Sequence, residues 1–309
     1  MKYPSYLALS EKELKERKEK AYEILKSCIL CPRECRVNRL EGKRGFCRVG
    51  KKPIVSSFAP HFGEERCLVG RFGSGTIFFT FCNLSCVYCQ NYEISQLGEG
   101  REIEVSQLAW MMISLQKMGC HNINLVTPTH QVPQIIEALI LARKAGLKIP
   151  IVYNTNAYEK VETLKLLEGI VDIYMPDFKY SDNKKAEKYS SAPNYFEIAK
   201  LAIKEMHRQV GDLKIKEKAD KDPKNLPPGV AVRGLLVRHL VLPNDLSGTE
   251  KIIDFLAKEI SPNTAINIMD QYRPCFLAFN YPELSRRISP EEYKKAYLLA
   301  KKAGLRIIN

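Results

Sequence analysis

The chain has 309 residues, of which 45% are hydrophobic and 27% charged, a composition typical of a folded globular protein and not of a disordered one. No apolar run approaches the roughly 20 residues of a membrane-spanning helix, and the first residues lack the apolar stretch of a signal peptide. We therefore expect a soluble cytoplasmic protein that does not act at a membrane. The net charge of +13 is spread without a long block of one sign, which favours the surface of a heat-tolerant protein but leaves RNA open as a partner.

The N-terminal part predicts one helix followed by a compact cysteine-rich segment. Ser10 and Glu13 form the pattern of a capping box, so a charged helix should begin there and run to about Lys26. The next segment, CILCPRECRVNRLEGKRGFC, contains proline and glycine and predicts a knuckle with little regular structure. Residues 51–75 have few periodic signals and predict a connector with short strands.

From Thr76 onward, short apolar runs alternate with amphipathic segments of helical length, which implies a parallel sheet with right-handed crossovers. Six such units predict the α/β class and a partial (β/α)6 TIM-like barrel, open on one side. A flat doubly wound sheet is the alternative, but no Gly-x-Gly-x-x-Gly follows the first strand. We expect strands at 76–81, 123–127, 149–154, 171–176, 235–243 and 265–270, and helices near 105–118, 132–146, 159–168, 194–210, 247–260 and 290–303.

This change of pattern predicts two parts of the chain. Residues 1–75 would hold the N-terminal helix, the metal knuckle and the connector, and residues 76–309 would form the partial-barrel core. Within the core, residues 211–229 are polar and contain proline, so they predict a surface loop before the fifth strand.

Three cysteines, Cys82, Cys86 and Cys89, directly follow the first predicted barrel strand, where the loops of an α/β barrel build the active site. A closed [4Fe–4S] cluster takes four cysteines, so three thiolates leave one iron with an open position. Such an iron can chelate S-adenosylmethionine, and an electron from the cluster can cleave this cofactor to methionine and a 5′-deoxyadenosyl radical. The alternative is a zinc site or a ferredoxin-like cluster completed by Cys67, Cys120 or Cys275.

The cysteine motif, with Tyr88 before its third cysteine, resembles the radical S-adenosylmethionine superfamily, in which the aromatic residue lies against the adenine of the cofactor. Along the whole chain, segments such as NLVTPTHQVP, VYNTNAY, DIYMPDFKY and IMDQYRP look like the proteins related to pyruvate formate-lyase activating enzyme. The resemblance implies an oxidoreductase with a [4Fe–4S] cluster and S-adenosylmethionine, served by a flavodoxin- or ferredoxin-like electron donor.

The resemblance also implies residues that bind the cofactor. Where activases have a Gly-Gly-Glu-Pro turn after the second strand, this chain has Thr-Pro-Thr-His, so a hydroxyl or imidazole would hold the amino group instead. After the fourth strand, Asp177 and Lys179 should point to one side, with Lys179 against the cofactor carboxylate; a salt bridge on the rim is the alternative. The implied residues are Tyr88, Thr129, Asn154, Asn156, Asp177, Lys179, His239 and Met269, with a packing role equally open for Met269.

In the fifth strand, Arg238 and His239 interrupt an apolar run, and by alternation they should face opposite sides. Because an unpaired imidazole is costly in a dry core, we expect His239 to face the cavity and to hydrogen-bond the cofactor. The alternative is a histidine packed against a helix and bonded to a backbone carbonyl.

Cys28, Cys31, Cys35 and Cys47 supply four thiolates, which suit a closed site. Their spacing is compatible with a structural zinc ion or with a complete iron–sulfur cluster, so both stay open at this stage.

Three functions compete. The first is a radical enzyme that abstracts hydrogen from a glycyl residue of a protein, as the activases do. The second is the same chemistry on RNA or a small metabolite. The third is a non-enzymatic iron–sulfur or zinc protein, which would need neither a six-unit barrel nor charged residues inside strands.

Overall fold

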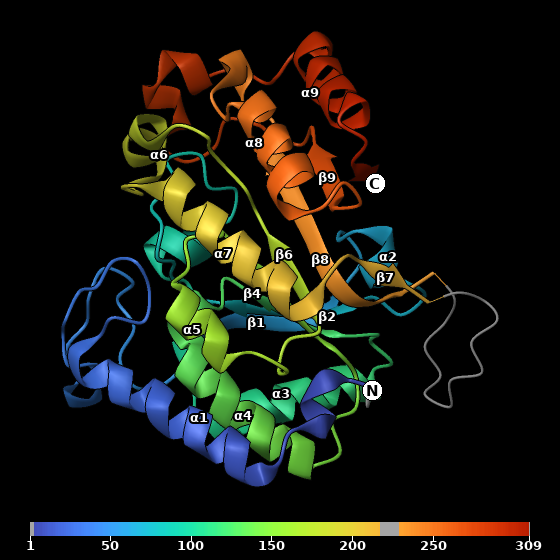
Figure 1. Cartoon of the computed structure of the whole chain (residues 1–309). Coiled ribbons are helices and arrows are strands. Elements are labelled where there is room, and N and C mark those ends of the chain that lie inside the picture. Colours follow the sequence, from blue (N-terminus) through green and yellow to red (C-terminus); the bar gives the residue numbers. More distant parts are fainter. Residues whose placement is uncertain (1–2, 217–228, 309) are drawn as a thin grey trace.

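The computed structural model describes residues 3–216 and 229–308, and its centre is an open, mostly parallel sheet (Figure 1). The strand order is β10-β9-β8-β6-β5-β4-β2-β1-β3, and among the residues described neither end of the sheet pairs with the other. The predicted α/β class and partial barrel are therefore confirmed. The strands are β1 (Ile54–His61), β2 (Ser74–Phe79), β3 (Arg101–Glu102), β4 (Ile123–Val126), β5 (Ile151–Thr155), β6 (Ile173–Pro176), β7 (Lys214–Ile215), β8 (Ala231–Leu240), β9 (Ala265–Met269) and β10 (Arg306–Ile307).

The six predicted barrel strands correspond to β2, β4, β5, β6, β8 and β9, and each pairs in parallel with its neighbour. At the edges, β1 pairs antiparallel with β2 and with β3, and β7 pairs antiparallel with β8. The predicted loop 211–229 lies mostly outside the described residues, and its first residues contribute β7.

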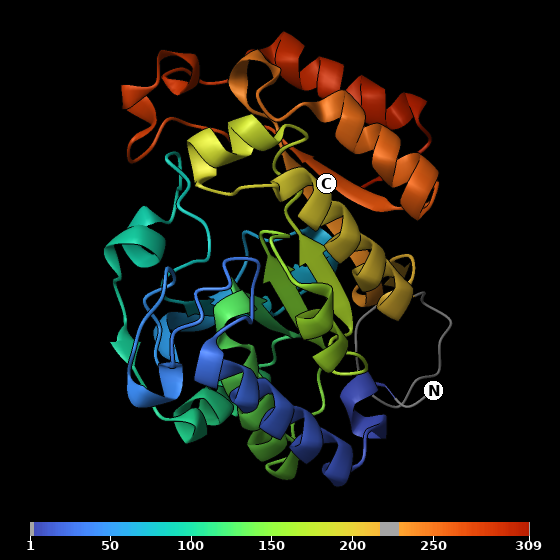
Figure 2. The ribbon, with the colours of Figure 1, turned by 60° about the vertical axis from the view of Figure 1, so that its left-hand side comes forward.

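Helices cover the outer face of the sheet, and Figure 2 shows α1 lying along this layer. The predicted capping box of Ser10 and Glu13 is present, and the α-helix it begins ends at Glu23, after which a 3-10 turn continues to Ser27. The helices are α1 (Glu11–Glu23), α2 (Arg66–Val69), α3 (Val105–Lys117), α4 (Val132–Lys144), α5 (Val161–Leu166), α6 (Asn183–Ser190), α7 (Tyr195–Val210), α8 (Thr249–Phe255) and α9 (Pro290–Lys302).

Side chains alternate between the two faces of the strands, and this alternation decides what reaches the barrel interior. Val152, Ile173 and Leu236 point inward, where they contact Cys67 and Leu68 of α2 in one apolar cluster. The short helix α2 therefore fills the interior beneath the carboxyl ends of the strands. The boundary at residue 75 stays a prediction, and both β1 and α2 lie on its N-terminal side.

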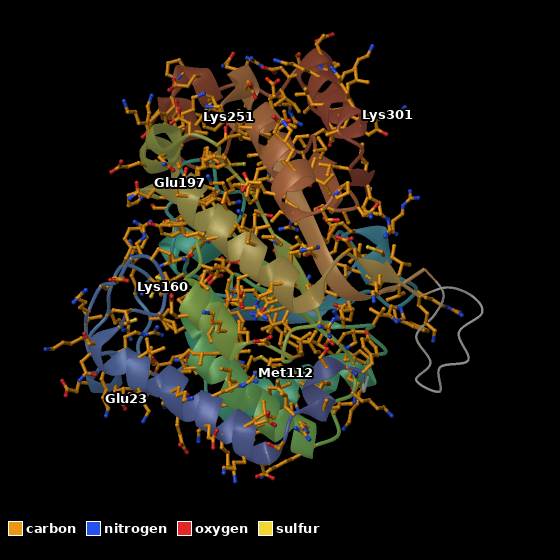
Figure 3. All side chains as sticks on the ribbon, in the orientation of Figure 1. Glu23, Met112, Lys160, Glu197, Lys251 and Lys301 are labelled. Carbon is orange, nitrogen blue, oxygen red and sulfur yellow. The ribbon has the colours of Figure 1, made fainter. Side chains whose placement is uncertain are left out.

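Charged side chains project outward from many elements, and Figure 3 labels Glu23, Lys251 and Lys301 on three separate helices. Lys160 lies at the start of α5 and bonds Glu34 of the cysteine-rich segment at 2.6 Å, which ties that segment to the barrel. Within residues 3–216 and 229–308, no helix has the length and apolar character that a membrane span requires.

Candidate active site

The three cysteines of the motif lie on the loop that follows β2, and each sulfur has a polar partner. Leu84 N and Asn156 Nδ2 each donate to Cys82 Sγ at 3.3 Å. Ser190 Oγ donates to Cys86 Sγ at 3.0 Å, and the hydroxyl of Ser95 lies 3.1 Å from Cys89 Sγ. Donors of this kind stabilise thiolates and orient them as ligands of a metal centre.

Burial raises the pKa of Cys82 to about 12 and that of Cys86 to about 11. The positive charge of Lys179 opposes this rise at Cys86. Such thiols ionise when a metal centre takes the place of the proton, and three of them on one loop fit a [4Fe–4S] cluster with one open iron.

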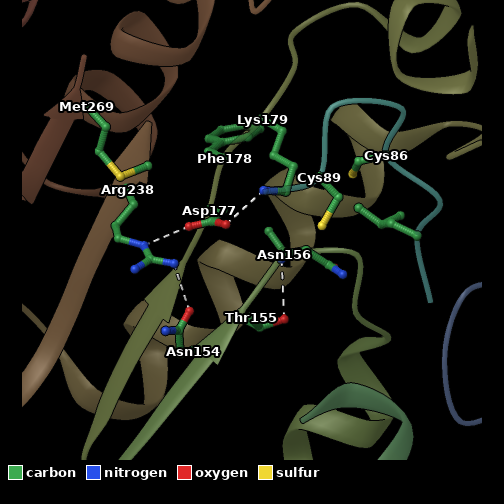
Figure 4. A network of polar contacts seen from close by, with 12 residues as sticks. Cys86, Cys89, Asn154, Thr155, Asn156, Asp177, Phe178, Lys179, Arg238 and Met269 are labelled. Atoms are coloured by element: carbon green, nitrogen blue, oxygen red, sulfur yellow. Dashed lines mark hydrogen bonds and ion pairs between the residues drawn. The ribbon is translucent and has the colours of Figure 1, made fainter. Parts of the chain in front are cut away.

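Beside the cysteine loop, Asp177 lies at the end of β6 between two cations (Figure 4). Arg238 Nε donates to one carboxylate oxygen at 2.7 Å, and Lys179 Nζ donates to the other at 2.8 Å. Burial by itself raises the pKa of Asp177, but the two cations outweigh it and lower the pKa to about 2. Arg238 also donates to Asn154 Oδ1 at 2.9 Å and to Glu64 Oε2 at 3.2 Å, so one guanidinium joins four segments of the chain.

Several implied residues come together here. Figure 4 places Lys179 between Asp177 and the cysteines, with Met269 of β9 on the other side beside Arg238. Asn156 reaches Cys82, and the hydroxyl of Tyr195 donates to Asn156 O or Asp177 O, which ties the loops after β5 and β6 together.

Tyr88 is 4% exposed and packs edge-on against Tyr180 and Tyr272. Its hydroxyl accepts a hydrogen bond of 2.6 Å from Tyr180, whose oxygen lies 2.8 Å from Ser190, the partner of Cys86. A chain of hydroxyls therefore connects this tyrosine to the cysteine loop.

The structure does not bring His239 to this network. Arg238 and His239 do face opposite sides, but Arg238 is the residue that points inward, because its strand position lies beside Asp177. His239 is fully buried, with Nδ1 2.8 Å from Phe178 O and Nε2 3.0 Å from Thr249 Oγ1. This geometry matches the alternative of a histidine packed against a helix.

Thr129 also lies away from the network. Its hydroxyl donates to Glu159 Oε1 at 2.6 Å, as does that of Thr155 at 2.5 Å, on the face of β5 opposite to Asn154. Burial raises the pKa of Glu159 to about 7. Neither this carboxyl group nor that of Glu64 was predicted as part of the site, because no motif marks either residue.

Comparison with known proteins gives the family of this chain. Residues 76–215 match the family model described as the radical SAM superfamily, where SAM denotes S-adenosylmethionine. The chain belongs to this superfamily, whose members are enzymes that catalyse radical reactions with a [4Fe–4S] cluster and S-adenosylmethionine. The narrower resemblance to activating enzymes stays a prediction.

A curated relative, "Uncharacterized protein MJ0674" of Methanocaldococcus jannaschii, is 38% identical over 299 residues, which cover 94% of this chain and 79% of the relative. Solved structures similar to this chain include SuiB of Streptococcus suis bound to precursor peptide SuiA, with 13% identity, coverage of 74% of this chain and 46% of that chain, and a TM-score of 0.47. The hydrogenase maturase HydG of Carboxydothermus hydrogenoformans has 12% identity, 72% and 49% coverage, and a TM-score of 0.47. Methylornithine synthase has 13% identity, 98% and 79% coverage, and a TM-score of 0.48. The chain spans about half the length of the first two structures.

Replacing His239 with Asn should lower thermal stability and leave S-adenosylmethionine affinity unchanged. The variant loses one or both hydrogen bonds of a fully buried ring, a loss of roughly 1–3 kcal/mol. Calorimetry gives the melting temperature, and titration of the anaerobically reconstituted protein gives the affinity. Weaker cofactor binding at an unchanged melting temperature would return His239 to the site.

Replacing Glu159 with Gln should change how stability depends on pH. Because the pKa rises from 4.5 in the unfolded chain to about 7 in the fold, the folded state holds a proton that the unfolded state has lost between these values. Wild-type stability therefore falls as the pH rises through this window. From about pH 4.5 to 7.5 we expect the variant to gain roughly 1–3 kcal/mol relative to wild type in urea unfolding. If the free energy of unfolding depends on pH in the same way in both proteins, the pH dependence belongs to a group other than Glu159.

Proposed function

We propose that this enzyme cleaves S-adenosylmethionine reductively at a [4Fe–4S] cluster bound by Cys82, Cys86 and Cys89, and then abstracts hydrogen from its substrate. The observation that carries this proposal is the arrangement in Figure 4, in which a cysteine loop and a buried cation lie together at the carboxyl edge of a partial barrel. When bound, the cluster would supply the iron that holds the cofactor and would pass on the electron that cleaves it.

The chain's own residues bind and orient the cofactor. Lys179 offers its ammonium group to the carboxylate of the cofactor, while Asp177 holds that ammonium in place at 2.8 Å. Asn154 and Asn156 supply amide groups at the carboxyl end of the neighbouring strand β5. Met269 lies beside Arg238 (Figure 4). We add Arg238 to the site, since it occupies the inward position that was expected of His239.

For Tyr88 we propose contact with the adenine ring, as in the superfamily. Its burial between Tyr180 and Tyr272 gives a rigid apolar wall next to the cysteines. Thr129 is proposed as a residue that fixes the loop after β5 through Glu159 and not as a direct ligand.

The proposed substrate is a glycyl residue of a protein, as the activase resemblance implies. Large exposed apolar side chains on segments that contact the cysteine loop support a protein substrate: Leu97 is 66% exposed, Leu277 43% and Phe279 66%. Leu97 ends the turn that brings Ser95 to Cys89, and Leu277 N donates to Val87 O. RNA is less well supported, because the positive charges are spread along the chain without a long block of one sign.

We also propose a flavodoxin- or ferredoxin-like electron donor and a location in the cytoplasm. None of the ten cysteines forms a disulfide, which is what a reducing compartment maintains. A second metal site, of zinc or iron–sulfur type, at Cys28, Cys31, Cys35 and Cys47 completes the proposal.

Changing Cys82, Cys86 and Cys89 together to Ala should abolish the formation of 5′-deoxyadenosine from S-adenosylmethionine under dithionite, because no ligand set for the cluster remains. Cys120→Ala is the matched control, since this buried thiol lies outside the motif and should leave the rate unchanged. Product formation is followed by chromatography. Continued cleavage by the triple variant would refute the central assignment.

If the enzyme abstracts hydrogen from the Cα of a glycyl residue, that hydrogen atom should appear in the product 5′-deoxyadenosine. Protein extract from source cells grown on Cα-dideuterated glycine should yield 5′-deoxyadenosine that carries deuterium, as read by mass spectrometry. The triple variant serves as the blank. Product without deuterium, formed at a rate that depends on the extract, would exclude a glycyl Cα as the source of hydrogen.

A further inference from the structure

The four N-terminal cysteines line a single pocket together with Arg39 and His130. Cys28, Cys31 and Cys47 are buried and Cys35 is half-buried. In Figure 1 this segment is the blue loop beside the end of α1. The spacing of the cysteines predicted a shared site, and the fold gathers all four around one space.

Local backbone contacts shape this pocket. Cys28 N donates to Val37 O at 2.9 Å and Arg36 N donates to Cys28 O at 3.0 Å, which closes a turn around Cys31 and Cys35. A Cβ on Gly45 would lie 2.7 Å from Cβ and Sγ of Cys35, so only glycine lets the chain pass there. Phe46 N donates to Cys35 Sγ at 3.3 Å, a contact that favours a thiolate.

Four thiolates suit either of two kinds of metal centre. In a zinc site all four sulfurs converge on one ion, each about 2.3 Å away. In a [4Fe–4S] cluster each thiolate binds a different iron, so the four sulfurs surround a larger space. The four cysteines here line a common pocket with Arg39 and His130, and a shared space of this kind accommodates a cluster.

Arg39 brings a buried positive charge to this pocket. It is 1% exposed, its Nη1 lies 3.9 Å from Cys28 Sγ, and its other donors bond the carbonyl oxygens of Gly50 and His130. Among the described residues it forms no ion pair with a carboxylate. A buried cation of this kind is stabilised by a negatively charged group, which four thiolates around a cluster supply.

His130 is the independent observation that points to an occupant. It is 1% exposed and lines the pocket, and its Nδ1 has no hydrogen-bond partner among the described residues. Its Nε2 lies 2.9 Å from Thr80 O, which can only accept, so Nε2 carries the proton of that bond. The unpaired Nδ1 is costly in a dry pocket, so it points to an occupant that gives this nitrogen a polar partner.

From these contacts we infer that Cys28, Cys31, Cys35 and Cys47 bind a second [4Fe–4S] cluster, with Arg39 and His130 in contact with it. The inference does not depend on the proposed S-adenosylmethionine chemistry. The pocket is joined to the first cysteine loop, because Arg33 Nε donates to Asn83 O at 2.8 Å and His130 bonds Thr80 O. The second centre therefore stabilises the segment that carries Cys82.

Metal and sulfide analysis of the full chain after anaerobic reconstitution tests this inference. We expect about eight irons and eight sulfides per chain in the wild type and about four of each in the Cys82/Cys86/Cys89→Ala variant. Cys28→Ala with Cys31→Ala should also retain about four irons. If this double variant does not fold, the triple variant still decides, since its remaining iron can only belong to the second centre. About one zinc per chain without this iron, or no metal in the triple variant, would overturn the inference.

His130→Ala in the triple-variant background tests the contact with the imidazole. We expect about four irons to remain while the electron paramagnetic resonance signal of the reduced cluster and its midpoint potential both change, because a polar group beside the cluster is lost. His121→Ala is the matched control, since this buried imidazole accepts hydrogen bonds from Arg71 N and Phe72 N, which lie outside the pocket. An unchanged signal and potential in the His130 variant would remove the imidazole from the site.

Discussion

The buried carboxylate of Asp177 holds together the end of the barrel on which the active site is built. It bonds Arg238 from β8 and Lys179 from its own segment, and it pairs with Arg238 where β6 and β8 run side by side. A buried ion pair of this kind is expensive to break, since removing one partner leaves an unpaired charge and costs about 3–5 kcal/mol. The orientations of Lys179 and Asn154 both depend on this one group.

The same network joins opposite sides of the open sheet. Arg238 also bonds Glu64, and the neighbouring Glu65 accepts a hydrogen bond from Asn267 of β9. These two glutamates precede α2, whose apolar side chains fill the barrel interior below them. The connector that contains Glu64, Glu65 and α2 has few periodic signals in the sequence, yet it spans the gap between the unpaired ends of the sheet. Its two glutamates make the polar contacts, and the apolar side chains of α2 pack below them.

The two cysteine groups are parts of one continuous structure. Arg33 follows the second cysteine of the N-terminal group and bonds the main chain next to Cys82, while Asn83 donates to Tyr158 O and accepts from Asn156. Lys160, two residues beyond Tyr158, bonds Glu34 between two N-terminal cysteines. Three loops therefore position one another around the motif, so the N-terminal segment supports the site as well as carrying its own thiols.

Much of this protein could be predicted from sequence because periodicity and spacing are local properties. The alternation of apolar runs and helices predicted the six parallel strands, and the spacing of Cys82, Cys86 and Cys89 predicted the superfamily. Alternation also predicted that Arg238 and His239 face opposite sides, but it could not say which side is the interior. Only the pairing of β6 with β8 decided that, because Asp177 offers Arg238 a buried counter-charge while Thr249 and Phe178 O take both nitrogens of His239. No motif marks Glu64 or Glu159, and their partners Arg238 and Thr129 are distant in sequence, so their roles exist only in the tertiary structure.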